Sequence, residues 1–203
     1  RVLVWNTLPT ASGVAADLVL GQGSLTACVA NDSLRNSTVG LRAATTLDGP
    51  SDVWSDGTRI IVADRGNNRV LVWSKFPATS GAAADLVLGQ TSFTLARDDA
   101  TASVLLQPSA VTYASNHLYV ADAGHNRVLG WNALPTTNGA AADLVLGQGD
   151  FTHVSANDDA QAGQDGSAPT KRTLSFPSGV TTAGNALVVS DTLNRRFLIF
   201  QRH

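Results

Sequence analysis

Short runs of apolar residues recur along this chain, and each is followed closely by an aspartate. The runs span 60–63, 118–121 and 187–189. They are rich in β-branched residues and lack proline and glycine, which is typical of strands buried on both faces. Five residues after each aspartate an arginine opens a second apolar run, as in RIIVADRGNNRVLVW from Arg59. This spacing predicts a hairpin with a five-residue connection.

The connection itself is rich in residues that favour turns. Asp64 can accept hydrogen bonds from N–H groups of its own turn, and Gly66 can supply a positive φ. Asn67 and Asn68 tolerate left-handed geometry. Turn chemistry therefore explains most of the motif.

The hairpin belongs to a longer repeated unit. A proline precedes each aspartate by fourteen residues, and an ADLVLGQ segment follows the hairpin at 84–90 and 142–148, with a further copy at 16–22. Each unit yields four consecutive strands without helices, which is the signature of a β-propeller blade. The predicted fold is an all-β propeller of four-stranded antiparallel blades, about three and a half in this chain. The expected divisions are the end of one blade (1–22), two blades (50–90 and 108–148) and an incomplete blade (177–203).

These segments resemble a known family. VADRGNNRVLVW, VADAGHNRVLGW and SDTLNRRFLIF are similar to NHL repeats, and the LPT…ADLVLGQ…FT extension resembles secreted or surface bacterial proteins with tandem NHL repeats. The resemblance implies a β-propeller, most often six-bladed, that is extracellular or at the cell surface. Ser190, Phe197, Ala110 and Asp52 depart from the usual pattern.

Composition agrees with a β-rich globular domain. A chain of 203 residues with 43% hydrophobic content can bury a sizeable core without a metal or disulfide. All sixteen acidic residues are aspartate, and methionine is absent. The net charge of −2 gives no reason to expect a nucleic-acid partner, and no apolar run is long enough for a membrane span. The single cysteine, Cys28, excludes an internal disulfide framework and is expected to be an unpaired thiol.

The repeated aspartates and arginines are the first chemical candidates. Their spacing lets each carboxylate meet the guanidinium of its own hairpin. A group that recurs in every blade is explained most simply by folding, so we predict structural braces rather than a ring of ligand-binding arginines. The predicted braces are Asp64 with Arg69, Asp122 with Arg127, and Asp191 with Arg196.

Less symmetric residues are the better candidates for binding. The long loops between blades carry acidic clusters, and in a propeller they share a face with the hairpin turns and with two histidines. The predicted binding face contains Asp32, Asp98, Asp99, His125, His153, Asp158 and Asp159. Carboxylates on these loops suit calcium, but the D-x-D-x-D-G spacing is absent and solvated loop acids are the simpler interpretation. Only His125 and His153 can converge on a metal, whereas catalytic zinc normally takes three protein ligands.

Two classes of function follow. The first is a non-enzymatic binding or scaffolding module that presents its variable loops to a protein, peptide or glycan, without a cofactor. The second, allowed by the family resemblance, is part of a metal-dependent propeller lyase or lactonase. The sequence contains no motif that pairs a nucleophile with a base, so no catalytic residue is predicted.

Closure of the ring is the remaining question, because propellers typically have roughly four to eight blades. We predict that these residues form part of a six-bladed propeller whose remaining blades belong to a larger chain. The alternatives are a second copy that pairs as a half-ring and a compact four-bladed ring. In the dimer, Arg1–Trp5 and Arg196–Phe200 would compete for one third-strand position.

Overall fold

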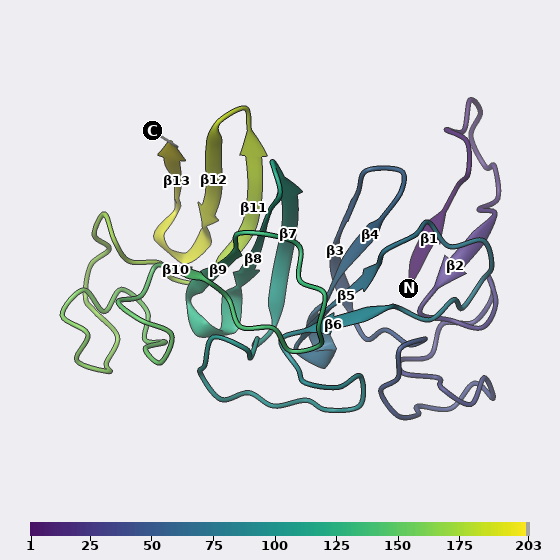
Figure 1. The fold of residues 1–203 in the computed structure, drawn as a ribbon, viewed down its shortest axis with the longest axis horizontal. Helices are drawn as coiled ribbons and strands as arrows, with labels where there is room; N and C mark the ends of the chain where they lie inside the picture. Colours follow the sequence, from purple (N-terminus) through teal and green to yellow (C-terminus); the bar gives the residue numbers. More distant parts are fainter. Residues whose placement is uncertain (202–203) are drawn as a thin grey trace.

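The computed structural model describes residues 1–201, and within that range the chain forms four antiparallel sheets in sequence order (Figure 1). Sheet 1 contains β1 (Val2–Val4) and β2 (Leu18–Leu20). Sheet 2 contains β3 (Pro50–Ser55), β4 (Ile60–Asp64), β5 (Arg69–Trp73) and β6 (Leu86–Leu88). Sheet 3 contains β7 (Pro108–Ala114), β8 (His117–Asp122), β9 (Arg127–Trp131) and β10 (Leu144–Leu146). Sheet 4 contains β11 (Pro177–Ala183), β12 (Ala186–Asp191) and β13 (Arg196–Gln201).

The strand order in every sheet is the order along the chain, as expected for propeller blades. The sheets stand side by side in a row, with sheet 1 at one end and sheet 4 at the other (Figure 1). The predicted all-β architecture of propeller blades is confirmed. Arg202 and His203, the last residues of the predicted 177–203 blade, lie outside the described residues.

The core lies between neighbouring sheets, which explains why the middle strands lack an apolar–polar alternation. All five residues of β4 and all five of β5 are buried. One apolar cluster joins sheets 1 and 2, a second joins sheets 2 and 3, and a third joins sheets 3 and 4. Each inner sheet therefore buries both faces, and the run of apolar residues in its strands follows from that position.

The two ends of the blades differ. The long connections 21–49, 89–107 and 147–176 lie along one side of the row together with three 3-10 turns, η1 (Arg65–Asn67), η2 (Ala123–His125) and η3 (Thr192–Asn194) (Figure 1). We call this the loop side. The connections between third and fourth strands, 5–17, 74–85 and 132–143, start from the opposite ends of the blades, which we call the strap side. None of the described 3-10 turns approaches the length or apolarity that a membrane-crossing helix requires.

The turn of the hairpin agrees with the prediction at Asn68, which is left-handed with φ 54°. It differs at Gly66, which does not have a positive φ. Gly66 is needed for space instead, because a Cβ there would lie 2.7 Å from the Asp48 carbonyl oxygen. The side chain of Asp64 does not cap a backbone N–H group of its own turn. It accepts instead from the side-chain amide of Asn67, at 2.7 Å, and from the backbone N–H of Asp48 in the preceding connection.

Candidate functional site

Each predicted Asp–Arg pair is in direct contact on the loop side of its sheet. The Nε atom of Arg69 donates to Oδ2 of Asp64 at 2.7 Å. The same distance joins the corresponding atoms in the other two pairs, Asp122 with Arg127 and Asp191 with Arg196. Both members of the first two pairs are fully buried, whereas the side chain of Arg196 in the terminal sheet is 26% exposed.

Arg69 and Arg127 also hold the loops on both sides of their sheets, and Arg196 holds the loop before its sheet. Arg127 donates to the carbonyl oxygens of Thr101 and Val104, each at 2.9 Å, in the preceding connection. It donates to the carbonyl oxygen of Phe151 in the following connection at 2.5 Å. A planar guanidinium with five N–H groups suits this arrangement, because it can satisfy several acceptors in fixed directions. One side chain therefore joins three segments that are distant in sequence.

The aspartate contributes its second oxygen to the same network. Oδ1 of Asp122 accepts from the backbone N–H of Leu106, sixteen residues earlier, at 2.7 Å. Asp64 makes the equivalent contact with Asp48 N at 2.7 Å, and Asp191 with Ser175 N at 2.8 Å. Burial raises the pKa of Asp64. The carboxylate is thus a structural acceptor that depends on its arginine for charge compensation.

A second layer of polar contacts lies beside the braces in sheets 2 and 4. Asn67 of η1 and Asn31 of the preceding loop exchange two amide hydrogen bonds, at 2.9 and 3.0 Å. Asn194 and Asn157 form the matching pair at 2.8 and 2.9 Å. These pairs were not predicted from the sequence. The signal is an Asn-Asp step in each loop, matched by an asparagine three residues after the brace aspartate.

His125 takes the place of this asparagine in sheet 3. Its Nδ1 atom lies 2.9 Å from Oδ2 of Asp122, and its Nε2 atom lies 3.0 Å from the carbonyl oxygen of Asp98. The ring is buried, with only 3% of its surface exposed. The longer side chain reaches a connection that is shorter here than in the other sheets. Both ring nitrogens therefore have protein partners, and neither faces solvent.

The predicted acidic residues fall into two groups. Asp32 and Asp158 are buried and hold their own loops, since each accepts two backbone N–H groups four and five residues further on. The hydrogen bonds from Ala162 and Gly163 lower the pKa of Asp158. Asp99 and Asp159 instead form exposed ion pairs with arginines of their own loops, Arg97 and Arg172. The structure does not gather these carboxylates around one point.

His153 and His125 have different hydrogen-bond partners. Its Nδ1 atom lies 2.8 Å from Oδ1 of Asp150, and this hydrogen bond raises the pKa of His153. Within residues 1–201, no three His, Cys, Asp or Glu side chains are grouped as metal ligands would be. Cys28 is exposed and unpaired by another cysteine. The predicted face is therefore a set of locally anchored loops.

One of these loops presents an apolar surface that sequence analysis did not identify. Leu34, Val39 and Leu41 are 76%, 78% and 79% exposed. The loop that carries them is closed, because Leu41 N donates to Ser33 Oγ at 3.3 Å and the buried Asp32 holds its first turn. In the sequence, the only indication of this surface is the presence of three large apolar residues within a long polar connection. Such side chains on an anchored loop are suited to contact with a partner.

Residues of sheets 2, 3 and 4 line a hollow of about 330 Å³. In sheets 2 and 3, the serine that directly follows the first proline of the blade donates a hydrogen bond to the next sheet. Ser51 Oγ donates to the carbonyl oxygen of Pro108 at 3.0 Å, and Ser109 Oγ donates to that of Pro177 at 2.8 Å. Ser51 and Ser109 therefore hold neighbouring blades together, and within residues 1–201 their hydroxyl groups contact backbone carbonyl oxygens rather than a side-chain base.

Comparison with known proteins gives matches only among solved structures. No protein-family model matches the chain, and no curated protein does. A streptogramin B lyase structure is 10% identical with a TM-score of 0.32, and a virginiamycin B lyase from Staphylococcus aureus is 16% identical with a TM-score of 0.32. Each match covers 80% of this chain and 56% or 58% of the other, so the chain spans little more than half their length. Membership of the NHL-repeat family stays a prediction.

Proposed function

We propose that this chain is a binding module of the β-propeller type that presents its loop side to a protein or peptide. The observation that carries the proposal is the anchored loop 32–41, with its three exposed apolar side chains. Exposed apolar groups that are held in place lose little conformational freedom on binding, which favours recognition. The proposal includes NHL-type repeats and a location outside the cell or at its surface.

The framework beneath the loops supports the same proposal. Arg69 and Arg127 are fully buried and are satisfied by protein carbonyl oxygens and their aspartates, so they are not available to a ligand. The connections above the braces differ in length and in exposed residues, whereas the braces repeat with one geometry. Variable loops on a repeated scaffold are a common arrangement in binding proteins.

Selection from a displayed peptide library tests this proposal directly. Peptides enriched on the wild-type protein should lose binding to Leu34→Ser/Val39→Ser/Leu41→Ser. Leu8→Ser is the matched control, because Leu8 is 91% exposed on the strap side. Circular dichroism should show both variants folded. Peptides that bind the triple variant as well as wild type, or that require Leu8, would contradict the proposal.

A metal-dependent lyase or lactonase is the second candidate. Two similar structures are lyases by name, and this role would use His125, His153 and the loop aspartates. Its difficulty is the geometry of His125, whose two ring nitrogens are already engaged. Metal analysis of the purified protein, followed by mass spectrometry of virginiamycin B incubated with it, tests this role. A stoichiometric ion and a cleaved product, both lost in His153→Ala, would replace the binding proposal.

A further inference from the structure

One cationic side chain on the loop side departs from the repeat. Arg65 is the first residue of η1 and directly follows the brace aspartate Asp64. The same position holds Ala123 in η2 and Thr192 in η3. Arg65 is half-buried, and its Nη2 atom donates to Oε1 of Gln107 at 3.3 Å. Because Gln107 directly precedes sheet 3, this side chain reaches from one blade to the next.

The guanidinium of Arg65 also lies against an aromatic ring from a third sheet. Its Cζ atom is 5.5 Å from the ring centroid of Phe176, which directly precedes sheet 4. A cation within about 6 Å of a ring centroid is attracted to the π face, and a planar guanidinium can stack on it. Arg65, Gln107 and Phe176 therefore meet from three successive sheets. We call these three residues the Arg65 cluster.

Two members of the Arg65 cluster occupy a position where the backbone favours glycine. Gln107 and Phe176 each precede the proline of their blade, with left-handed φ values of 50° and 49°. Sheet 2 has Gly49 there, at φ 55°. A bulky side chain is disfavoured in this conformation, and a following proline restricts the backbone further. The two strained side chains are also the two that contact Arg65, and strain of this kind concentrates at functional sites.

The strained backbone is held in each case by the preceding blade. Gln107 N donates to Oδ1 of Asn68 at 3.0 Å, and Phe176 N donates to Oδ1 of Asn126 at 2.8 Å. Asn68 and Asn126 are the left-handed residues that end η1 and η2. These contacts fix Gln107 and Phe176 in the absence of a ligand, and preorganised groups lose little conformational freedom on binding.

Arg65 retains hydrogen-bonding capacity that the protein does not use. Within residues 1–201, its only side-chain hydrogen bond is the one to Gln107, and no aspartate forms an ion pair with it. In that same range neither its Nε nor its Nη1 atom is a buried group without a partner, so both reach solvent. The guanidinium therefore presents a positive charge and N–H donors on the loop side.

Arg59 shows that stacking on a ring does not by itself leave an arginine unpaired. Its Cζ atom lies 5.2 Å from the ring centroid of Tyr113, close to the distance between Arg65 and Phe176. Arg59 is also half-buried, but its Nη2 atom forms an ion pair with Oδ2 of Asp56 at 3.1 Å. The two arginines therefore have similar aromatic contacts and differ in the carboxylate.

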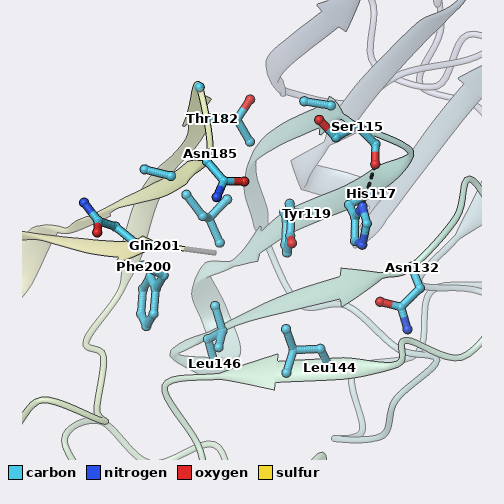
Figure 2. A pocket seen from close by; sticks show the side chains of 14 residues that line it. Ser115, His117, Tyr119, Asn132, Leu144, Leu146, Thr182, Asn185, Phe200 and Gln201 are labelled. Atoms are coloured by element: carbon cyan, nitrogen blue, oxygen red, sulfur yellow. Dashed lines mark hydrogen bonds between the residues drawn. The ribbon is translucent and has the colours of Figure 1, made fainter. Parts of the chain in front are cut away.

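The hairpin of the next blade also supplies a partner for its own polar side chain. His117 occupies in sheet 3 the position of Arg59 in sheet 2, and its ring is stacked with that of Tyr119 at a centroid distance of 6.3 Å. Figure 2 shows its Nδ1 atom directed at the carbonyl oxygen of Ser115, 2.7 Å away, on the wall of a groove of about 310 Å³. Local partners are thus usual at these hairpins, whereas Arg65 is held by distant residues that carry no negative charge.

We propose that the Arg65 cluster binds a carboxylate group of a ligand. The guanidinium supplies the charge and the donors, Gln107 positions it, and Phe176 covers one of its faces. A planar guanidinium suits a carboxylate because the two groups can form two parallel N–H···O bonds. The carboxylate can belong to the C-terminus of a peptide or to an acidic side chain. No residue of the loop 32–41 forms part of this site, so the inference stands apart from the proposed role of that loop.

NMR titration of the arginine Nε–Hε signals tests the site with three small probes. The Arg65 signal is assigned by its absence in Arg65→Lys. N-acetylalanine carries a chain-terminal carboxylate, the α-amide of N-acetylaspartic acid carries a side-chain carboxylate, and N-acetylalaninamide carries neither. At constant ionic strength, at least one of the two carboxylates should shift the Arg65 signal in a saturable manner and leave Arg59 unchanged. The carboxylate that binds more tightly identifies the source.

Four results of these titrations would overturn the proposal. They are an Arg65 signal that neither carboxylate moves, an equal shift with N-acetylalaninamide, an equal shift at Arg59, and tighter binding of inorganic phosphate than of either carboxylate. The Leu34→Ser/Val39→Ser/Leu41→Ser variant should keep the response of Arg65. The site and the peptide-binding loop can therefore fail independently.

Gln107→Gly separates a binding role from a structural one. Glycine removes the left-handed strain, as at Gly49, so the melting temperature should be no lower than that of wild type. The same change removes the partner of Nη2 and should weaken the carboxylate response of Arg65. Ser115→Gly is the matched control, since Ser115 is exposed at φ 49° and lies outside the cluster. A lower melting temperature with an unchanged response in Gln107→Gly would show that Gln107 is structural and would overturn its role in the site.

Discussion

The most informative perturbation of the framework is Asp122→Ala. The change removes the acceptor of Arg127 Nε, of the Leu106 backbone N–H and of His125 Nδ1, at 2.7, 2.7 and 2.9 Å. Arg127 is fully buried and would retain three carbonyl partners but no opposite charge. Loss of one partner of a buried ion pair costs about 3 to 5 kcal/mol. We expect a decrease of that size in the free energy of unfolding, measured by urea denaturation with tryptophan fluorescence.

Two matched substitutions make this prediction specific. Asp143→Ala removes one hydrogen bond, from Asn132 N at 2.8 Å, at an exposed position in the same sheet, so its cost should be within about 1 kcal/mol. Asp191→Ala should fall between the two, because water reaches the partly exposed Arg196 and replaces part of the lost interaction. Equal effects of Asp122→Ala and Asp143→Ala would refute the structural role of the brace.

Three further predictions concern single residues. The hydrogen bond that His153 Nδ1 donates to Asp150 raises the pKa of His153, so Asp150→Asn should lower the midpoint of the His153 titration measured by NMR; an unchanged midpoint would contradict the contact. His125→Asn should fold, because asparagine stands there in sheets 2 and 4, but amide exchange in the loop 96–101 should become faster than in wild type. Gly89 and Gly57 share a φ near 80°, but only a Cβ at 89 meets a neighbour, at 2.6 Å, so Gly89→Ala should lower the melting temperature more than Gly57→Ala.

The fold was predictable because its signals repeat. Fixed distances between proline, aspartate and arginine gave the strand order in each sheet, and continuous apolar runs indicated sheets packed on both faces. The turn of the hairpin was predicted less well. Local chemistry suggested that Asp64 caps its own turn, but Oδ1 binds Asp48 of the preceding connection. Turn preferences do not contain such contacts, because they join residues sixteen positions apart.

The loop side was harder to predict, since its residues have several compatible roles. Asp32 and Asp158 read as ligands on flexible loops, yet both are buried and hold their own turns. An acidic residue next to small and polar neighbours can serve as an anchor or as a ligand, and sequence alone does not distinguish them. Leu34 was overlooked for the opposite reason, because a single apolar residue in a loop carries no periodic signal.

The contacts of the braces explain how regular blades coexist with dissimilar loops. Each brace arginine binds the preceding connection seven and four residues before the proline of its own blade, as at Ala43 and Thr46, and so fixes the end of that loop. Arg69 and Arg127 also bind the start of the following loop, eight residues after the ADLVLGQ aspartate, as at Phe93. The stretches between these points, 26–42, 94–100 and 152–169, lie outside the contacts of the brace arginines. Insertions there leave the braces and the strand register unchanged. The exposed apolar loop lies within the first of these stretches, where a change in recognition would cost the fold least.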